Sequence, residues 1–205
     1  MRPSRSGLEK INAAAVRVIG LRGFSEATTQ EIAKAAGVSE GLIYRYYDTK
    51  MKLGEELFKK HHQELLATLR EEIARHGDPV ERQRAAAGAY FRWFDANPDV
   101  ARFLLRTYSE FLDKAGEQQG LMHLATGSLR DLLGEPLFRL FPSDIIAAMI
   151  LGALMMVSLE CLHGQVAGPL APRMEPIIDI MLNFIQQAVP GVPLKTGRSP
   201  PDRNP

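Results

Sequence analysis

The segment from Thr28 to Tyr47 constrains the fold of this chain more than any other, because it has the residues of two short helices separated by a tight turn. Thr28 and Glu31 have the spacing of a capping box at a helix start, and Gly37 can adopt the left-handed conformation that ends that helix. Ser39 is suited to cap the second helix. Helical spacing then predicts an inward-facing apolar set: Ile32, Ala33, Ala36, Val38, Ile43 and Tyr47.

Helical periodicity continues through the rest of the 205 residues, and no run shows the two-residue alternation of strands between hairpin turns. We therefore predict an all-α fold of about nine helices. The first is expected from about Ser4 to Arg22, and the fourth from near Lys50 to His76. The later ones are expected to start at Asp78-Pro79 and Asn97-Pro98, to run from about Gln118 toward Leu133, to follow Pro142-Ser143 as far as Gly164, and to carry an apolar face from Ile177 to Ala188.

The composition is that of a globular protein, with 45% hydrophobic and 24% charged residues. Residues 1–60 carry 11 Lys and Arg against 7 Asp and Glu, whereas the whole chain has a formal net charge of +1. This basic excess fits a nucleic-acid footprint and, equally, a solvated charged face. A single cysteine, Cys161, and a start without an apolar leader favour a cytoplasmic protein without disulfides.

The most apolar stretch runs from Ile145 to Val157. At this length it is too short to span a bilayer, so we expect no membrane association. A helix that is apolar over most of its circumference is usually buried on two sides, here by its own chain and by a partner. Residues 191–205 are polar and rich in proline, and we expect this tail to be disordered.

The outward face of the second short helix has a composition that is unusual for a merely solvated surface. It is expected to expose Glu40, Gly41, Leu42, Tyr44, Arg45 and Tyr46. Hydroxyls and cations hold DNA phosphates, while residues near the start of such a helix reach base edges. Taken by themselves, these residues leave an ordinary helical hairpin as the alternative.

A longer pattern decides between the two. The residues Gly-Phe-x-x-x-Thr-Thr-x-x-Ile-Ala-x-x-Ala-Gly-Val-Ser-x-Gly-x-Ile-Tyr-x-Tyr-Tyr-x-x-Lys, from Gly23 to Lys50, closely resemble the N-terminal domain of the tetracycline-repressor-like (TetR) family. The resemblance implies a helix-turn-helix DNA-binding domain over residues 1–50, with its motif at 28–47, and a helical ligand-binding and dimerisation domain over residues 51–190. It also implies a homodimer formed through the last two helices, a palindromic double-stranded operator and a small-molecule effector.

The resemblance further implies which residues meet DNA. Phosphate-contacting positions of the family correspond to Thr28, Thr29, Tyr44 and Lys50, and positions near base edges correspond to Gln30, Glu40, Gly41 and Tyr46. The chain departs from the family pattern at Thr29, Leu42 and Met51, where an aliphatic, a hydroxyl and an acidic residue are common. The full set of expected DNA contacts is Thr28, Thr29, Gln30, Ser39, Glu40, Gly41, Leu42, Tyr44, Arg45, Tyr46 and Lys50.

Aromatic, methionine and polar side chains of the later helices are the candidate effector contacts. They are His61, Tyr90, Trp93, Phe94, Phe103, Tyr108, Phe111, Met122, His123, Met149, Met156 and Glu160. Side chains of this kind more often pack in a core, so the functional interpretation is that some of them line an apolar cavity with few polar anchors. No histidine or cysteine pair has metal-ligand spacing with partners, and no metal or cofactor is expected.

We therefore expect a repressor that is released from its operator by a hydrophobic or aromatic effector. An activator, or a helical scaffold that binds only protein partners, is the alternative. An enzyme is not expected, because the chain has no nucleophile elbow, phosphate-binding loop or dinucleotide fingerprint.

Overall fold

The computed structural model describes residues 5–115, 120–140 and 142–188. These ranges contain helices and no strand, which confirms the predicted all-α class. The expected tail at 191–205 and the expected helix start at Gln118 lie outside them. The helices are α1 (Arg5–Arg22), α2 (Thr29–Ala36), α3 (Glu40–Tyr44), α4 (Lys50–Ala74), α5 (Pro79–Ala96), α6 (Pro98–Ala115), α7 (Leu121–Leu133), α8 (Glu135–Leu140), α9 (Ser143–Leu162), a 3-10 turn η2 (Ala171–Arg173) and α10 (Met174–Ala188).

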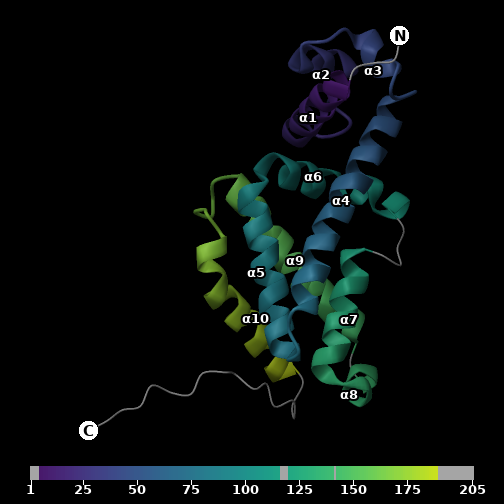
Figure 1. The fold of residues 1–205 in the computed structure, drawn as a ribbon. Helices are drawn as coiled ribbons and strands as arrows, with labels where there is room; N and C mark the ends of the chain where they lie inside the picture. The colour runs from purple at the N-terminus through teal and green to yellow at the C-terminus, as the bar shows by residue number, and fades with distance from the viewer. Residues whose placement is uncertain (1–4, 116–119, 141, 189–205) are drawn as a thin grey trace.

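The first three helices form an N-terminal head at one end of the molecule (Figure 1). Its core contains Ile11 and Ile19 of α1 together with Ile32 of α2 and Ile43 of α3, two of the predicted inward positions, and all four are at most 1% exposed. Branched and straight apolar side chains at this depth each contribute about 1.5–3 kcal/mol to folding. The head is therefore held by its own small core as well as by its connections to the rest of the chain.

Helix α4 leaves the head and runs down the molecule, and α6 crosses between the head and the remaining helices (Figure 1). α6 packs against both α1 and α4. Two glycines allow this close packing, because a Cβ on Gly54 would lie 2.7 Å from the rings of both Phe24 and Phe111, and one on Gly20 would lie 3.2 Å from the backbone nitrogen of Phe103. The head thus shares a tight interface with α6.

Helix α5 packs against α4, α7 and α10 pack against α5, and α9 packs against α7, so that these helices form the body with the lower half of α4 (Figure 1). A second apolar cluster lies here and includes Leu129, Ile146 and Ile178. Polar links join helices far apart in sequence: Arg84 of α5 pairs with Asp179 of α10 at 2.9 Å. The Asp95 carboxylate at the end of α5 accepts hydrogen bonds from the backbone nitrogens of residues 170 and 171, at 2.9 and 2.7 Å.

The observed elements differ from the expected ones in three places. α3 ends at Tyr44, so Arg45 and Tyr46 lie in a turn rather than in a helix that continues to residue 47. The short α8 is additional, because Gly134 interrupts the chain at φ 73° and a new helical turn begins at once. Ser39 has the extended backbone of a cap, but its side chain makes no capping hydrogen bond.

The helix that carries the apolar stretch has the expected bounds but is longer than the stretch itself, so its length does not exclude a membrane span as expected. Residues 143–162 form one continuous helix, α9, whose mean hydropathy of 2.3 and length of 20 residues would allow it to cross a membrane by those two criteria alone. Only 22% of that helix is buried within the chain. A helix covered by a partner protein has the same length and composition, so these criteria do not by themselves indicate a membrane span.

Candidate DNA-binding face and effector cavity

The start and end of α2 are fixed by local hydrogen bonds. The Thr28 hydroxyl accepts from the Glu31 nitrogen at 3.2 Å, and the Glu31 carboxylate accepts from the Thr28 nitrogen at 3.1 Å. Gly37 has φ 67° and ψ 37°, the left-handed conformation in which a side chain is disfavoured. The predicted capping box and one-residue turn are confirmed, and together they set the angle at which α3 follows α2.

Three predicted DNA contacts hydrogen-bond to one another on the outer side of α2 and α3. The Thr29 hydroxyl donates to the Glu40 carboxylate at 2.5 Å, and its oxygen lies 3.3 Å from the Tyr44 hydroxyl. The Tyr44 side chain is 48% exposed. These groups come from the start of α2 and both ends of α3, so the three side chains form one polar surface at the end of the head.

The segment that follows α3 is tied to α1. Tyr47 is 6% exposed, and its hydroxyl donates to Asn12 at 2.7 Å. Burial raises the pKa of Tyr47, so the phenol keeps the proton that makes this bond. Arg22 at the end of α1 forms an ion pair with Glu31. These contacts hold in place the backbone that carries the polar surface of Thr29, Glu40 and Tyr44.

Lys50, an expected phosphate contact, is hydrogen-bonded within the chain. Its ammonium group donates to the backbone oxygens of Phe24 at 2.8 Å, Ala27 at 2.9 Å and Ser25 at 3.4 Å. It also lies 4.6 Å from the centre of the Phe24 ring. An ammonium has three N–H donors, and all three are occupied here. In this structure Lys50 fastens the first turn of α4 to the loop that precedes α2.

The other expected DNA contacts lie on or beside the same surface. Gln30, Ser39, Gly41 and Arg45 are exposed, whereas Leu42 and Tyr46 are partly buried and pack against the apolar core. The structure therefore brings Thr29, Glu40 and Tyr44 together, whereas the ammonium group of Lys50 is bound to the loop before α2.

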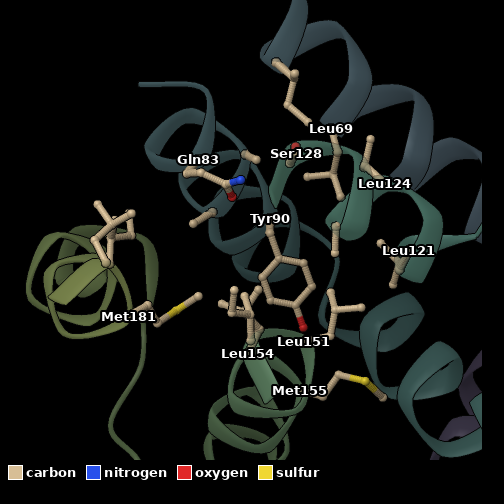
Figure 2. Close-up of a pocket in the computed structure, with 17 residues that line it drawn as sticks. Leu69, Gln83, Tyr90, Leu121, Leu124, Ser128, Leu151, Leu154, Met155 and Met181 are labelled. Carbon is tan, nitrogen blue, oxygen red and sulfur yellow. The ribbon is translucent and has the colours of Figure 1, made fainter. Parts of the chain in front are cut away.

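A cavity of about 80 Å³ lies in the body, between α4, α5, α7, α9 and α10. Figure 2 shows Tyr90 pointing into the space between the helices, with Leu121, Leu124 and Met181 around it. Polar side chains are few: Gln83, Ser128 and Tyr90, whose hydroxyl is 2.9 Å from the Ser158 hydroxyl. The rest of the lining is aliphatic or thioether: Leu69, Ile73, Ala86, Ala87, Leu121, Leu124, Ala125, Ile150, Leu151, Leu154, Met155, Ile178, Met181 and Leu182.

A second, smaller cavity of about 30 Å³ lies closer to the head, among α4, α5 and α6. Its lining includes His62, Trp93 and Tyr108. It shares Tyr90, Leu121 and Met155 with the larger cavity, so the same side chains form part of both walls.

Three of the twelve predicted effector contacts line these cavities: Tyr90, Trp93 and Tyr108. Phe94, Phe103 and Phe111 are core residues at most 3% exposed. The remaining six lie elsewhere, on partly buried or exposed surface: His61, Met122, His123, Met149, Met156 and Glu160.

His62 lines the smaller cavity but is not among the predicted effector contacts, which include its neighbour His61 instead. His61 pairs with Glu64 at 2.8 Å on the outer side of α4. His62 follows Phe58 by four residues and precedes Leu65 by three, and this helical spacing to apolar neighbours was the signal that could have identified it as the inward histidine.

One side of α9 carries exposed apolar residues at helical spacing. Ile145 is 55% exposed, Met149 50% and Met156 56%, and Gly152 and Ala153 between them are exposed as well. Ile180 on α10 is 68% exposed. Exposed apolar surface of this kind in a folded chain marks an interaction surface.

Within the described ranges, no three His, Cys, Asp or Glu side chains are grouped so that they could hold a metal ion. Burial raises the pKa of the Cys161 thiol, which favours the unreactive protonated form.

Residues 11–57 match the family model of bacterial regulatory proteins of the tetR family. Among curated relatives, the nucleoid occlusion factor SlmA of Haemophilus ducreyi is 30% identical over 106 residues, which cover 50% of this chain and 52% of that protein. The HTH-type transcriptional regulator BetI of Agrobacterium fabrum is 28% identical over 166 residues, which cover 80% of each chain. The chain thus spans about half the length of the SlmA relative and more of BetI.

Solved structures resemble the whole fold. The fatty acid degradation regulator FadR of Bacillus halodurans has a TM-score of 0.72 and 24% identity, covering 85% of this chain and 97% of that one. FadR of Bacillus subtilis, solved in complex with stearoyl-CoA, has a TM-score of 0.71 and 20% identity with the same coverage. At these identities the likeness concerns the fold. The match at residues 11–57 identifies the N-terminal part of the chain as a domain of the tetR family of bacterial regulatory proteins, and the remainder has the fold of these regulators.

Proposed function

We propose that this protein is a homodimeric repressor that binds a palindromic operator and is released from it by a small effector with an aliphatic chain. One observation carries the proposal: a single helix, α4, connects the polar surface of the head with the apolar cavity of the body. Lys50 fastens the start of α4 to the head, and Leu69 and Ile73 near its end line the cavity. A ligand that displaces the end of α4 therefore changes the position of the head.

The DNA contacts follow from the outer surface of α2 and α3. Thr29 and Tyr44 present hydroxyls suited to phosphate, and the Glu40 carboxylate is an acceptor suited to the amino group of cytosine. We assign DNA-facing positions to Thr28, Thr29, Gln30, Ser39, Glu40, Gly41, Arg45 and Tyr44, with Leu42 and Tyr46 at the edge of the head core. Lys50 acts as a positioning residue, and the head extends to the first turn of α4.

The effector class follows from the cavity lining. Among the lining residues that the structure describes, Tyr90 supplies the only aromatic ring, and the other contacts are mostly aliphatic. Such a wall favours a flexible aliphatic chain over a rigid aromatic compound. The stearoyl-CoA bound by FadR of B. subtilis is a ligand of this chemistry in a protein of the same fold. We propose that the protein acts by binding alone, without catalysis.

The dimer follows from the exposed apolar stripe of α9 and from Ile180 on α10. Water-exposed isoleucine and methionine side chains at this spacing gain about 25 cal/mol for each Å² that a partner covers. A two-fold arrangement would place the same stripe of each copy against the other and would hold two heads at a fixed spacing for two half-sites.

Selection from random double-stranded DNA tests the regulator itself. The purified protein is expected to enrich a palindromic sequence, and its affinity for that sequence is expected to fall steeply with salt. Replacing Tyr44 with alanine should weaken binding about tenfold to a hundredfold, whereas Lys59→Ala, an exposed change on α4, should leave it nearly unchanged. Binding without sequence preference or salt dependence would overturn the proposal.

Analytical ultracentrifugation tests the dimer. Met149→Glu places a charge in the proposed seam and is expected to produce monomers at micromolar concentration. Leu21→Glu changes a side chain that is 55% exposed on α1 and should leave the dimer intact. A protein that sediments as a monomer before any substitution would refute the homodimer.

A further inference from the structure

His62 holds an unpartnered polar atom deep in the molecule. In the described part of the chain, its Nε2 is the sole buried side-chain nitrogen or oxygen without a hydrogen-bond partner. The residue is 3% exposed. An unsatisfied buried polar group costs about 1–3 kcal/mol, so the chain carries this histidine at the expense of stability.

The ring of His62 is held in place by aromatic neighbours. It stacks on Phe58, with ring centres 5.3 Å apart and planes at 12°, and it lies 6.4 Å from the ring of Tyr108. Burial, and secondarily the charge of Arg70, lowers the pKa of His62, so the ring is neutral at neutral pH. A neutral imidazole has one donor and one acceptor nitrogen, so it suits an uncharged partner better than an ion.

The space beside this ring is large enough for a polar group. The smaller cavity, which His62 lines, has a volume of about 30 Å³, and a water-sized group needs about 10–15 Å³. Its other walls are mostly apolar, with Leu65 on α4 and Leu104 and Leu105 on α6. Trp93 and Tyr108 also line this space with an indole N–H and a phenol hydroxyl, and His62 contributes the ring nitrogen that has no hydrogen-bond partner.

The smaller cavity adjoins the proposed effector cavity. Tyr90, Leu121 and Met155 contribute to both walls. The hydroxyl of Tyr90 is engaged with Ser158, whereas Met155 is an unbranched, adaptable side chain. A ligand that fills the larger cavity can reach the smaller one when Met155 changes its rotamer.

We propose that the smaller cavity is the polar subsite of the effector site: it receives an uncharged hydroxyl or carbonyl group at one end of an aliphatic effector, and His62 Nε2 is the hydrogen-bond partner of that group. This inference rests on the effector cavity proposed above and adds the end-group chemistry. A carboxylate end is excluded, because an anion buried beside a neutral ring would lose its hydration without a compensating charge.

The position of His62 gives the bond a regulatory consequence. The residue lies on α4 between Phe58 and Leu65, and thus between the head and the larger cavity. Only a ligand that interacts differently with two positions of α4 can shift the protein between them. The hydrogen bond to His62 supplies such an interaction directly on the connecting helix.

Paired probes test the subsite in the full-length protein. 1-Octanol and 1-chlorooctane have the same chain, and only the alcohol has a hydrogen-bonding end. Both affinities are measured by displacement of a fluorescent apolar reporter, in the wild type and in His62→Phe. The ratio of the alcohol affinity to the chloride affinity is expected to fall about tenfold in His62→Phe, the factor for one hydrogen bond.

Two further variants make the result specific. His61→Phe changes the neighbouring, partly buried histidine that pairs with Glu64 and should leave the ratio unchanged, and His62→Gln should restore much of it. In ¹⁵N spectra of the wild type, octanol should shift the His62 Nε2 resonance, and chlorooctane should shift it less. An equal ratio in the wild type and His62→Phe, without that shift, overturns the polar subsite while leaving the cavity in place. Failure of both probes to bind the wild type would remove the effector cavity and the subsite with it.

Discussion

The head and the body of this protein are packed in opposite ways. In the head, small residues and hydrogen bonds leave little freedom: Gly37 sets the turn, Tyr47 is bonded to Asn12, and Lys50 is bonded to three backbone oxygens. In the body, two cavities lie between the helices, and His62 keeps an unpartnered nitrogen. A surface that reads DNA needs one shape, whereas a site that responds to a ligand needs space and unused hydrogen-bonding capacity.

The largest effect is expected in the head at Lys50. Lys50→Met keeps the apolar stem and removes the donors, so the free energy of unfolding should fall by roughly 3 kcal/mol, because bonds to charged groups are worth about 1.5–3 kcal/mol each. Urea denaturation at one protein concentration measures it. Lys52→Met removes an exposed pair with Glu56 and should cost less than about 1 kcal/mol. If Lys50→Met weakened DNA binding without lowering the free energy of unfolding, Lys50 would instead be a phosphate contact.

The next largest difference between the head and the body is expected when alanine is replaced by the larger leucine. Ala33 is 4% exposed in the head, and Ala33→Leu is expected to cost about 2 kcal/mol by overpacking. Ala125 lines the larger cavity, so Ala125→Leu should change stability by less than about 1 kcal/mol. The same Ala125 variant should bind 1-octanol more weakly. Equal costs for both substitutions would mean that the body is packed as tightly as the head.

Two helix-interior glycines offer a smaller contrast. Gly54→Ala gains helix propensity of up to about 1 kcal/mol but meets two aromatic rings, and a net loss of about 1 kcal/mol is expected. Gly127→Ala on α7 meets nothing within 4 Å and should stabilise the protein by up to about 1 kcal/mol. Thermal unfolding of both variants gives the comparison, and a stabilised Gly54→Ala would show that α4 and α6 can separate without cost.

The smallest effect concerns pH and the unpartnered histidine. Because the pKa of His62 is lowered by burial, the unfolded chain binds a proton below about pH 6.5 that the folded protein does not. Stability should therefore fall as the pH is lowered from about 6.5 toward the folded-state pKa. His62→Phe should reduce this dependence, measured by urea denaturation at several pH values. An identical pH profile in both proteins would indicate that His62 titrates normally.

The head was predictable from sequence because its determinants are local. Thr28 and Glu31 are three residues apart, and Gly37 directly follows the helix that it ends. A short window of sequence therefore contains both the residues that determine α2 and the helix itself. The role of Lys50 was not visible in the same way. Its partners Phe24 and Ala27 precede it by 26 and 23 residues, and only the folded loop brings their oxygens to one point.

The body was predictable as helices but not as a site. Aromatic residues such as Phe103 and Phe111 were candidates for the cavity, yet they fill the core between α4 and α6. A cavity arises where packing is incomplete, and this depends on how several helices meet rather than on any one residue. The aliphatic lining from Leu124, Ile150 and Leu154 therefore has no signature that separates it from ordinary core.

Gly54 links the residues that are acceptable in the head to those that are acceptable in α6. Its missing side chain leaves room for one ring from the head, Phe24, and one from α6, Phe111, whose centres are 5.0 Å apart. Any descendant that acquires a larger residue at position 54 must also accept a smaller residue at 24 or 111, or else a changed angle between the head and α6. Substitutions at these three positions are therefore expected to occur as a set, because the angle between the head and α6 depends on all three side chains.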